Sequence, residues 1–505
     1  MPTSDPTYFA MQSESRHAAL VDRCVPADIT LDRRISSAAL KEPAYLSRSR
    51  IVALYRSLVA VALVSLMPST GRAQDSAPTL HFKPSAHALG DVHPYFHDGK
   101  CFLFSLKPGS YESVLACSED WLRWTEIPIT HTPLVEEEWF SPYYVLGVFR
   151  DERAKVFRSF YGHAAGRMVS SASSDLLHWS SGPKAVSIPP ADYYERRRDP
   201  FVFWDPERKN YGCVMTTWMK GQSKESGGAI SLATSKDLLD WEDHGAIIYP
   251  GDIGEPECPQ MFRIGAEWYL LASIYDRGVG RPVYWRSVSP TGPWNSEPNG
   301  QLDGKDLCAS QLAFQDGRAF LFGWIPLQPA RPGAQHWGGH LALPREVYAL
   351  HDGHLAIRIP KKMDDFFSTL SWKQVPDFEL TVEGRTIEGC EKRMVTQFEL
   401  QLNSAAPEAF VHLDPLGKVS FSENNLRILD HQGAVWAETL IQLDATRPAA
   451  VRIVLDEDIV EAFVDDRYSL CARLPKRDGP SQLSFQTPQG SAAVRGLRFA
   501  NLNFR

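Results

Sequence analysis

The phrase SEDWLRW at residues 118–124 returns as SDLLHW at residues 174–179 and as SKDLLDW at residues 235–241. A looser form, SPTGPW, occupies residues 289–294. The closing tryptophans of these phrases are 55, 62 and 53 residues apart, a period typical of four-stranded propeller blades with long loops. Each phrase is expected to join two strands, with Ser and Asp in the turn, Leu packed inward and Trp opening the outer strand.

Strand-like runs lie on both sides of these phrases. Examples are Cys101–Leu106, Tyr211–Thr217 and Trp268–Ile274, which are rich in β-branched and aromatic residues and are bounded by Gly, Pro, Asp and Ser. No long stretch keeps the apolar period of 3.6 residues that marks a helix. About 270 residues at the blade period correspond to five blades. The sequence therefore predicts an all-β chain in which residues 80–360 form a five-bladed β-propeller.

The rhythm changes near residue 361. Runs such as Thr396–Leu402, Arg452–Leu455 and Ile459–Val464 alternate apolar and polar residues, and no blade phrase occurs among them. Roughly 140 residues with this pattern are typical of a β-sandwich. We therefore expect a C-terminal β-sandwich at residues 361–505, with the boundary at Arg358–Lys362.

The first 73 residues are expected to be a leader and signal peptide. Three arginines between residues 48 and 56 precede the apolar run Leu58–Met67, and the small residues Gly71 and Ala73 follow it. The 47 residues in front are polar, which indicates either a start codon upstream of the true one or a disordered leader. A buried helix is the alternative for the apolar run. The pattern predicts a secreted or periplasmic protein with no membrane attachment after cleavage.

Composition excludes several classes of protein. The chain has 505 residues, of which 43% are hydrophobic and 23% charged, so it is an ordinary globular sequence. Its net charge of −8 argues against a nucleic-acid partner. No run of 18 apolar residues is present to span a membrane. The sequence also lacks a phosphate loop, a nucleotide fingerprint and CxxC spacing, so we expect no cofactor and no metal.

Cysteines leave the redox compartment open. Seven of the eight would remain after cleavage near Ala73, an odd number. Cys101 and Cys117 flank a turn at residues 107–110 and could face each other across a hairpin. They could form a disulfide there or remain two unpaired thiols.

Three acidic residues stand directly at the start of aromatic strand-like runs. Asp91 lies in GDVHPYF at residues 90–96, Asp199 in RRRDPF at residues 196–201, and Glu257 in GEPECPQMF at residues 254–262. Singly, each pattern is also typical of a turn or a strand cap. The innermost strand of each blade begins near the propeller axis, so one carboxylate per blade would converge there. Two carboxylates with different roles and a third that orients the substrate are the equipment of a glycosidase.

The chain resembles glycoside hydrolase family 32, the invertase, inulinase and levanase group of five-bladed propeller furanosidases. The resemblance rests on RDP at residues 198–200, ECP at 257–259, DLCASQ at 306–311, WGGHLALPRE at 337–346, and IVLD at 453–456 followed by EAFVDD at 461–466. It covers about residues 87–500. It implies a retaining hydrolase that releases fructose from β-fructofuranosides or fructans, with an oligosaccharide or polysaccharide as substrate.

The resemblance also implies residue roles. Asp91 would be the nucleophile, Glu257 the acid/base and Asp199 the stabiliser of the transition state. Arg198 would keep Asp199 ionised and oriented. The substrate contacts that we expect are Arg198, Phe140, Ser141, His93, Asp306 and Trp337.

This chain departs from the family pattern around the sugar. The family's first motif reads Trp-Met-Asn-Asp-Pro-Asn-Gly, and only Asp91 of GDVHP matches its acidic position. Pro256 stands where the family commonly has Trp, and Cys308 where it has Tyr. The resemblance therefore supports the type of reaction better than the identity of the substrate.

Three alternatives stay open from the sequence. A fructosyltransferase would use the same carboxylates with a sugar hydroxyl in place of water. A hydrolase of arabinosyl or xylosyl furanosides would keep the fold and change the sugar. A sugar-binding propeller without catalysis would keep only the binding residues. The oligomeric state is not determined by the sequence.

Overall fold

The computed structural model describes residues 77–503, except for position 111, residues 133–146, 163–167, 182–193, 277–278, 329–336 and 404–406, and position 445. The chain divides into two compact units, residues 1–71 and 72–505, and all described residues belong to the second. The predicted leader and signal peptide lie outside the described residues, as do Phe140 and Ser141. Among the described residues, no helix is long and apolar enough to cross a membrane.

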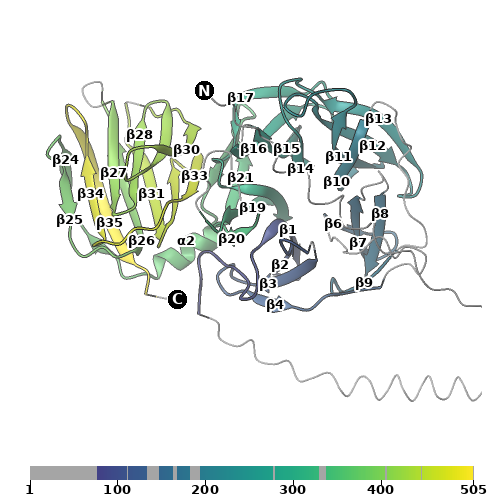
Figure 1. Cartoon of the computed structure of the whole chain (residues 1–505), viewed down its shortest axis with the longest axis horizontal. Helices are drawn as coiled ribbons and strands as arrows, with labels where there is room; N and C mark the ends of the chain where they lie inside the picture. Colours follow the sequence, from purple (N-terminus) through teal and green to yellow (C-terminus); the bar gives the residue numbers. More distant parts are fainter. Residues whose placement is uncertain are drawn as a thin grey trace, which may run out of the picture. The chain divides into compact units, whose positions relative to one another are not determined.

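Five small sheets follow one another along residues 90–358 (Figure 1). The first contains β1 (Gly90–His97), β2 (Lys100–Leu106), β3 (Ser113–Ser118) and β4 (Thr125–Ile127). The second contains β5 (Thr130–Thr132), β6 (Val148–Asp151), β7 (Val156–Gly162), β8 (Met168–Ser173) and β9 (His178–Ser181). The third contains β10 (Tyr194–Asp205), β11 (Asn210–Met219), β12 (Gly228–Ser235) and β13 (Trp241–Ile248). The fourth contains β14 (Pro256–Ile264), β15 (Glu267–Asp276), β16 (Val279–Ser287) and β17 (Asn295–Gln301). The fifth contains β18 (Cys308–Gln315), β19 (Arg318–Pro326), β20 (Gly339–Leu341), β21 (Arg345–Ala349) and β22 (Leu355–Arg358).

The recurring phrase forms the same turn in three blades. In each turn an Asp carboxylate oxygen accepts the backbone N–H groups two and three residues further on, at 2.7–3.0 Å for Asp120, Asp175 and Asp237. A serine two residues before the Asp completes the turn, and in the second phrase this is Ser173 rather than Ser174. The residue after the Asp is buried, as expected, and the closing tryptophans are buried beside it. The predicted five-bladed propeller is confirmed.

Residues before β1 complete the ring of blades. The backbone of Leu89 exchanges two hydrogen bonds with Gly339 in β20, at 3.0 and 2.8 Å, and the N–H of Leu341 donates to the carbonyl of Phe82 at 2.7 Å. A Cβ on Gly339 would lie 1.7 Å from the carbonyl oxygen of Ile325, so only glycine fits there. The segment around Gly339 and Leu341 therefore joins the first and last blades.

Two further sheets form the C-terminal β-sandwich, which is also confirmed. One contains β23 (Lys373–Gln374), β24 (Phe378–Leu380), β26 (Arg393–Gln401), β31 (Ala449–Asp456), β32 (Ile459–Val464), β33 (Tyr468–Arg473) and β35 (Ala492–Asn501). The other contains β25 (Arg385–Ile387), β27 (Glu408–Asp414), β28 (Gly417–Ser422), β29 (Asn425–Asp430), β30 (Val435–Leu440) and β34 (Gln482–Gln486). A helix that was not predicted, α2 (Lys361–Ser368), precedes them and buries Met363 and Phe367 on one face. Its apolar residues, Met363, Phe366 and Phe367, keep the helical spacing over little more than one turn, which is too short to stand out in the sequence.

One apolar core runs through the propeller, α2 and the sandwich, with members such as Leu343, Met363 and Phe463. A buried polar network crosses the same contact. The Arg345 guanidinium lies 3.0 Å from the Asp303 carboxylate and 2.6 Å from that of Glu461, and all three side chains are fully buried. Buried charges are tolerated only when they are paired, so this network holds the propeller and the sandwich in one arrangement.

His81 extends this network. Its two ring nitrogens lie 2.8 Å from carboxylate oxygens of Asp456 and Glu461, and the imidazole is buried. Burial alone would lower the pKa of His81, but the hydrogen bonds and charges of Asp456 and Glu461 more than offset it and raise the pKa to about 9.

We expect the free energy of unfolding to fall as the pH rises towards 9. Because the folded-state pKa of His81 lies above its ordinary value of 6.5, its stabilisation is complete below that value and is lost as the pH passes about 9. The shift corresponds to on the order of 3 kcal/mol. Urea unfolding between about pH 6 and pH 10 should show this loss in the wild type, and a flatter dependence in His81→Gln. Equal slopes in the two proteins would contradict this role.

The cysteines of the described part form no disulfide. The β2–β3 hairpin is present, but Cys101 pairs with Ser118 and Cys117 with Phe102, so the two thiols are not directly opposite. Of the two alternatives for this pair, the structure has free thiols.

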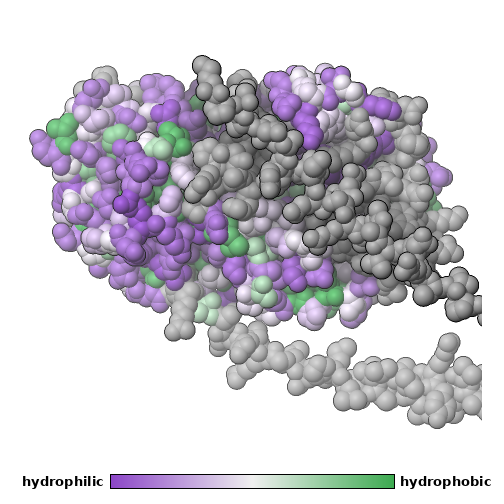
Figure 2. All heavy atoms as spheres, viewed as in Figure 1, coloured by the Kyte–Doolittle hydropathy of each residue, from purple (hydrophilic) through white to green (hydrophobic). Residues whose placement is uncertain are grey.

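The described part of the face in Figure 2 is largely hydrophilic, and its hydrophobic residues lie in small separate groups. Scattered apolar residues are normal on a protein surface, so this pattern carries no information about partners.

Candidate active site

Four inner strands carry the same irregularity near their starts. The pairing of β1, β10, β14 and β18 with the next strand slips between Gly90 and His93, Arg198 and Phe201, Glu257 and Gln260, and Cys308 and Gln311. The second residue of each four-residue segment has a positive φ: 34° at Asp91, 52° at Asp199, 50° at Cys258 and 42° at Ala309. Positive φ is uncommon for residues other than glycine. Such bulges re-aim side chains, and strained backbone clusters at functional sites.

The bulges give the predicted site residues equivalent places in different blades. Asp91 and Asp199 stand at the bulged position, whereas Arg198 and Glu257 stand one residue before it. The charges of Asp91 and Asp199 both act on Glu257, so the three carboxyl groups lie within electrostatic range of one another. The structure therefore brings together the three carboxylates that the sequence singled out.

Arg198 links Asp199 and Glu257 and also binds a further carboxylate, that of Glu255. Its guanidinium donates from Nη1 to Asp199 Oδ2 at 2.6 Å and from Nη2 to Glu257 Oε1 at 2.6 Å. Its third donor, Nε, reaches Glu255 Oε1 at 3.1 Å. Arginine presents its N–H groups in a fixed fork, so this one side chain sets the relative positions of three carboxylates.

Glu255 was not among the predicted site residues. Residues two apart on an extended chain point to the same side, and Glu255 stands two positions before Glu257. That spacing was the one sequence feature that could have identified Glu255 as a site residue. Without the bulge geometry, it did not distinguish a second site carboxylate from a solvated surface residue.

The Asp91 carboxyl is held by Trp337, whose indole Nε1 donates to Asp91 Oδ1 at 3.1 Å. A Cβ on Gly90 would lie 2.9 Å from the Trp337 ring, so glycine permits this close approach. Burial raises the pKa of Asp91 to about 6, although the Trp337 hydrogen bond opposes the shift and the charge of Asp199 adds to it. Trp337, predicted as a substrate contact, therefore lies directly beside the proposed nucleophile.

Glu257 has a higher pKa than Asp91. Burial raises it to about 7, with the Arg198 charge opposing and the charges of Asp199 and Asp91 adding to the shift. Its side chain keeps 35% of its surface exposed, so a ligand can reach the carboxyl group. Both carboxyl groups therefore hold a proton more readily than a free carboxyl group, and the pKa of Glu257 is the higher of the two, as suits a proton donor beside a nucleophile.

Two of the predicted substrate contacts, His93 and Asp306, are buried in the structure. His93 is 4% exposed, its Nδ1 lies 2.6 Å from Gln311 Oε1, and burial lowers its pKa to about 4, so it is a neutral core residue. Asp306 is fully buried and accepts the N–H of Arg473 from the sandwich at 2.9 Å. In both cases the side chain is hydrogen-bonded within the protein, and its contact with substrate stays a prediction. Phe140 and Ser141 lie outside the described residues.

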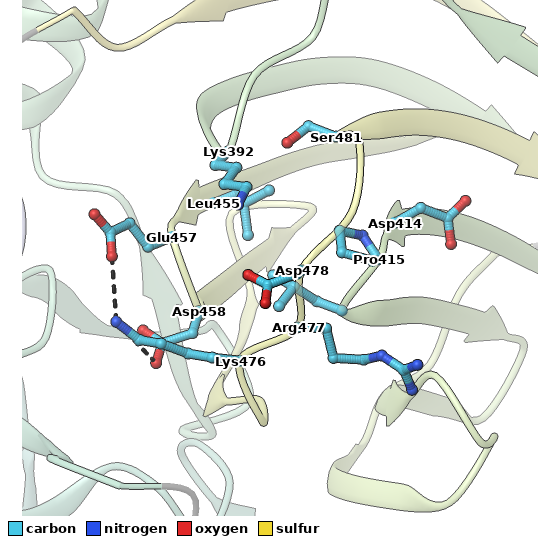
Figure 3. A pocket seen from close by; sticks show the side chains of 11 residues that line it. Lys392, Asp414, Pro415, Leu455, Glu457, Asp458, Lys476, Arg477, Asp478 and Ser481 are labelled. Atoms are coloured by element: carbon cyan, nitrogen blue, oxygen red, sulfur yellow. Dashed lines mark hydrogen bonds and ion pairs between the residues drawn. The ribbon is translucent and has the colours of Figure 1, made fainter.

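A separate pocket of about 110 Å³ lies in the sandwich (Figure 3). Lys476 crosses part of it and pairs with Glu457 at 3.3 Å and with Asp458 at 3.9 Å. Its lining contains no aromatic side chain and none of the predicted site residues. Saccharide sites commonly offer an aromatic face to the sugar, so this pocket does not compete with the propeller as the saccharide site.

Within the ranges that the structure describes, no group of three or more His, Cys, Asp or Glu side chains is placed to hold a metal ion.

Comparison with known proteins gives a consistent picture. The model of the glycosyl hydrolases family 32 N-terminal domain matches residues 96–358, a range that contains Arg198, Glu257 and Trp337 but begins after Asp91. Sucrose-6-phosphate hydrolase of Pediococcus pentosaceus is 25% identical over 331 residues, which are 60% of this chain and 64% of that protein. Raffinose invertase of Escherichia coli is 25% identical over 317 residues, which are 55% and 62% of the two chains. The chain thus spans less than two thirds of the length of these curated relatives.

Solved structures share the fold. A variant of fructan 1-exohydrolase IIa from Cichorium intybus, in complex with 1-kestose, has a TM-score of 0.67 and 14% identity, with 85% of this chain and 98% of that one covered.

Proposed function

The chain belongs to glycosyl hydrolase family 32, and on that premise we propose that it is a retaining glycoside hydrolase that releases fructose from β-fructofuranosides or fructans. The observation that carries the proposal is that Asp91, Asp199 and Glu257 lie within electrostatic range of one another, with Asp199 and Glu257 both bound by the guanidinium of Arg198. The relatives are named sucrose-6-phosphate hydrolase, raffinose invertase and fructan 1-exohydrolase. These names support a fructofuranoside as the substrate of this chain.

In the first step, an oxygen of the Asp91 carboxylate forms a bond to the anomeric carbon while the glycosidic C–O bond breaks. The electron pair of that bond goes to the leaving oxygen, which takes the proton of Glu257. The Trp337 N–H orients the Asp91 carboxylate and favours its ionised form.

In the second step, the Glu257 carboxylate removes a proton from water, and the resulting oxygen attacks the anomeric carbon. The ester bond to Asp91 breaks and restores its carboxylate. Asp199 stabilises the positive charge that develops on the ring in both transition states, and its own position is set by Arg198 and by the Cys258 N–H at 3.1 Å. Two inversions at one carbon give net retention.

The purified protein should release fructose when it is incubated separately with sucrose, sucrose-6-phosphate, raffinose, inulin and levan. A double variant, Asp91→Asn with Glu257→Gln, is the control for contaminating activity. Chain-lengthened products in place of free fructose would assign a fructosyltransferase. Release from arabinosyl or xylosyl furanosides alone would change the sugar class. Binding to fructans without any turnover would overturn the hydrolase and favour a sugar-binding propeller.

We also propose that the protein is exported and is cleaved near Ala73. The proposal rests on the basic residues, the short apolar run and the small residues at positions 71 and 73. N-terminal sequencing of the exported protein should find a start close to Gln74. A start well before residue 60 would contradict it.

A further inference from the structure

Arg198 also binds the carboxylate of Glu255, which has no role in the mechanism above. Glu255 Oε1 accepts a hydrogen bond from Arg198 Nε at 3.1 Å, while the two terminal nitrogens serve Asp199 and Glu257. The Glu255 side chain is only 13% exposed, compared with 35% for Glu257. A carboxylate so enclosed, bound to the same guanidinium as Asp199 and Glu257, is a component of the site and not a solvated neighbour.

The backbone between the two glutamates is fixed. Thr216 on β11 donates its hydroxyl to the carbonyl of Pro256 at 2.6 Å, and Pro256 itself has a restricted φ. Glu255 and Glu257 therefore approach the guanidinium from one short, rigid segment. The side chains at both ends of this segment bind Arg198. A substitution at Glu255 therefore alters the contact between Arg198 and Glu257.

Glu255 also affects the protonation of Glu257 through its negative charge. The charged or titratable groups of the described residues that face Glu257 are Asp91 on β1, Arg198 and Asp199 on β10, Cys258 on β14 itself and Cys308 on β18. Arg198 is the one cation in this set, and it favours the ionised form of Glu257. The acid step requires the protonated form, so the positive charge of Arg198 must be partly offset.

We propose that Glu255 is a positioning residue, which fixes the Arg198 guanidinium between Asp199 and Glu257 and offsets part of its charge. This inference rests on the proposed function, since it concerns the acid form of Glu257. It assigns to Glu255 no contact with the sugar. The residue acts through Arg198.

The Glu255→Gln variant of the full chain tests the proposal. Glutamine keeps a hydrogen-bond acceptor for Arg198 Nε and removes the charge. We expect the alkaline limb of the kcat/KM profile to move down by about one pH unit. Removing the charge of Glu255, which lies across the Arg198 guanidinium from Glu257, should lower the pKa of Glu257 by about that amount. Near pH 7, kcat should fall roughly fivefold while KM changes little, since the protonated fraction of Glu257 falls by about that factor. Glu255→Asp, which keeps the charge, should restore part of the profile.

Glu207→Gln is the matched control. Glu207 pairs with Arg263 at 2.6 Å on the surface, outside the site, so its loss removes a Glu–Arg pair without touching Glu257. Its pH profile should match that of the wild type. A Glu255→Gln profile that also matches would overturn the proposal. A raised KM with an unmoved profile would instead mean that Glu255 contacts the substrate, which contradicts the proposal as well.

A readout without turnover separates this inference from the proposed function. Infrared difference titration follows the protonated carboxyl of Glu257, assigned by its loss in Glu257→Gln. Its midpoint should be lower in Glu255→Gln than in the wild type. If no saccharide is cleaved but the midpoint shifts, the proposed function fails and the role of Glu255 stands. If fructose is released and the midpoint is unmoved, the function stands and the role of Glu255 fails.

Discussion

Asp91→Asn is expected to lower kcat for fructoside hydrolysis by about 10⁴-fold or more, because an amide cannot form the covalent ester through which the proposed mechanism passes. Asparagine has nearly the same shape and can still accept the Trp337 N–H that holds Asp91 at 3.1 Å. The loss should therefore appear in kcat, with little change in KM. Steady-state kinetics on the best substrate of the screen measure both.

Stability provides the control for Asp91→Asn. Since burial raises the pKa of Asp91 to about 6, its ionised form destabilises the folded protein above that pH. The variant should thus be at least as stable as the wild type near pH 8, as is common when a strained catalytic group is removed. An inactive variant with a clearly lowered melting temperature would show misfolding and not loss of a nucleophile.

Glu257→Gln is expected to lose on the order of 10²–10⁴-fold in kcat/KM for substrates with a sugar leaving group, because glutamine cannot donate the proton. The loss should be much smaller for fructosyl fluoride, whose leaving group needs no protonation. The alkaline limb associated with a pKa of about 7 should also disappear.

The comparison between the two substrates decides the role of Glu257. Glu207→Gln, which changes a glutamate outside the site, should leave both rates as they are. An equal loss on both substrates would remove Glu257 from the acid/base role and direct attention to Glu255, two residues away on the same guanidinium.

The propeller could be predicted because its signal is local. The blade phrase works through an Asp that caps its own backbone N–H groups, as at Asp120 and Asp237, and a residue that must be buried next to it. Such interactions span four to seven residues and recur in three of the five blades, so they are visible in the sequence. The sandwich followed from simple alternation of apolar and polar residues.

The direction of the site side chains could not be predicted in the same way. A one-residue slip reverses which side of a strand a side chain faces, and the slips at Gly90, Arg198, Glu257 and Cys308 have no sequence signature. His93 was therefore expected at the sugar although it is a buried neighbour of Gln311.

The place of Asp306 could not be predicted because it depends on a contact between residues far apart in the sequence. Asp306 was expected to contact substrate, yet its carboxylate receives the backbone of Arg473, which is 167 residues further along the chain. The threefold use of Arg198 likewise depends on the meeting of two blades. The acidic residues themselves were identifiable because each begins an inner strand, but which groups they bind follows only from the assembled fold.

The stereochemistry of the first product tests the central claim most directly, since it asks whether Asp91 forms a covalent intermediate. The wild-type enzyme should be supplied with a β-fructofuranoside in aqueous methanol, so that methanol traps the fructosyl group and the product cannot change its anomeric form. NMR of the first-formed methyl fructofuranoside reads the configuration. Two displacements predict the β-anomer, whereas the α-anomer would mean a single displacement by the acceptor and would contradict the nucleophilic role of Asp91.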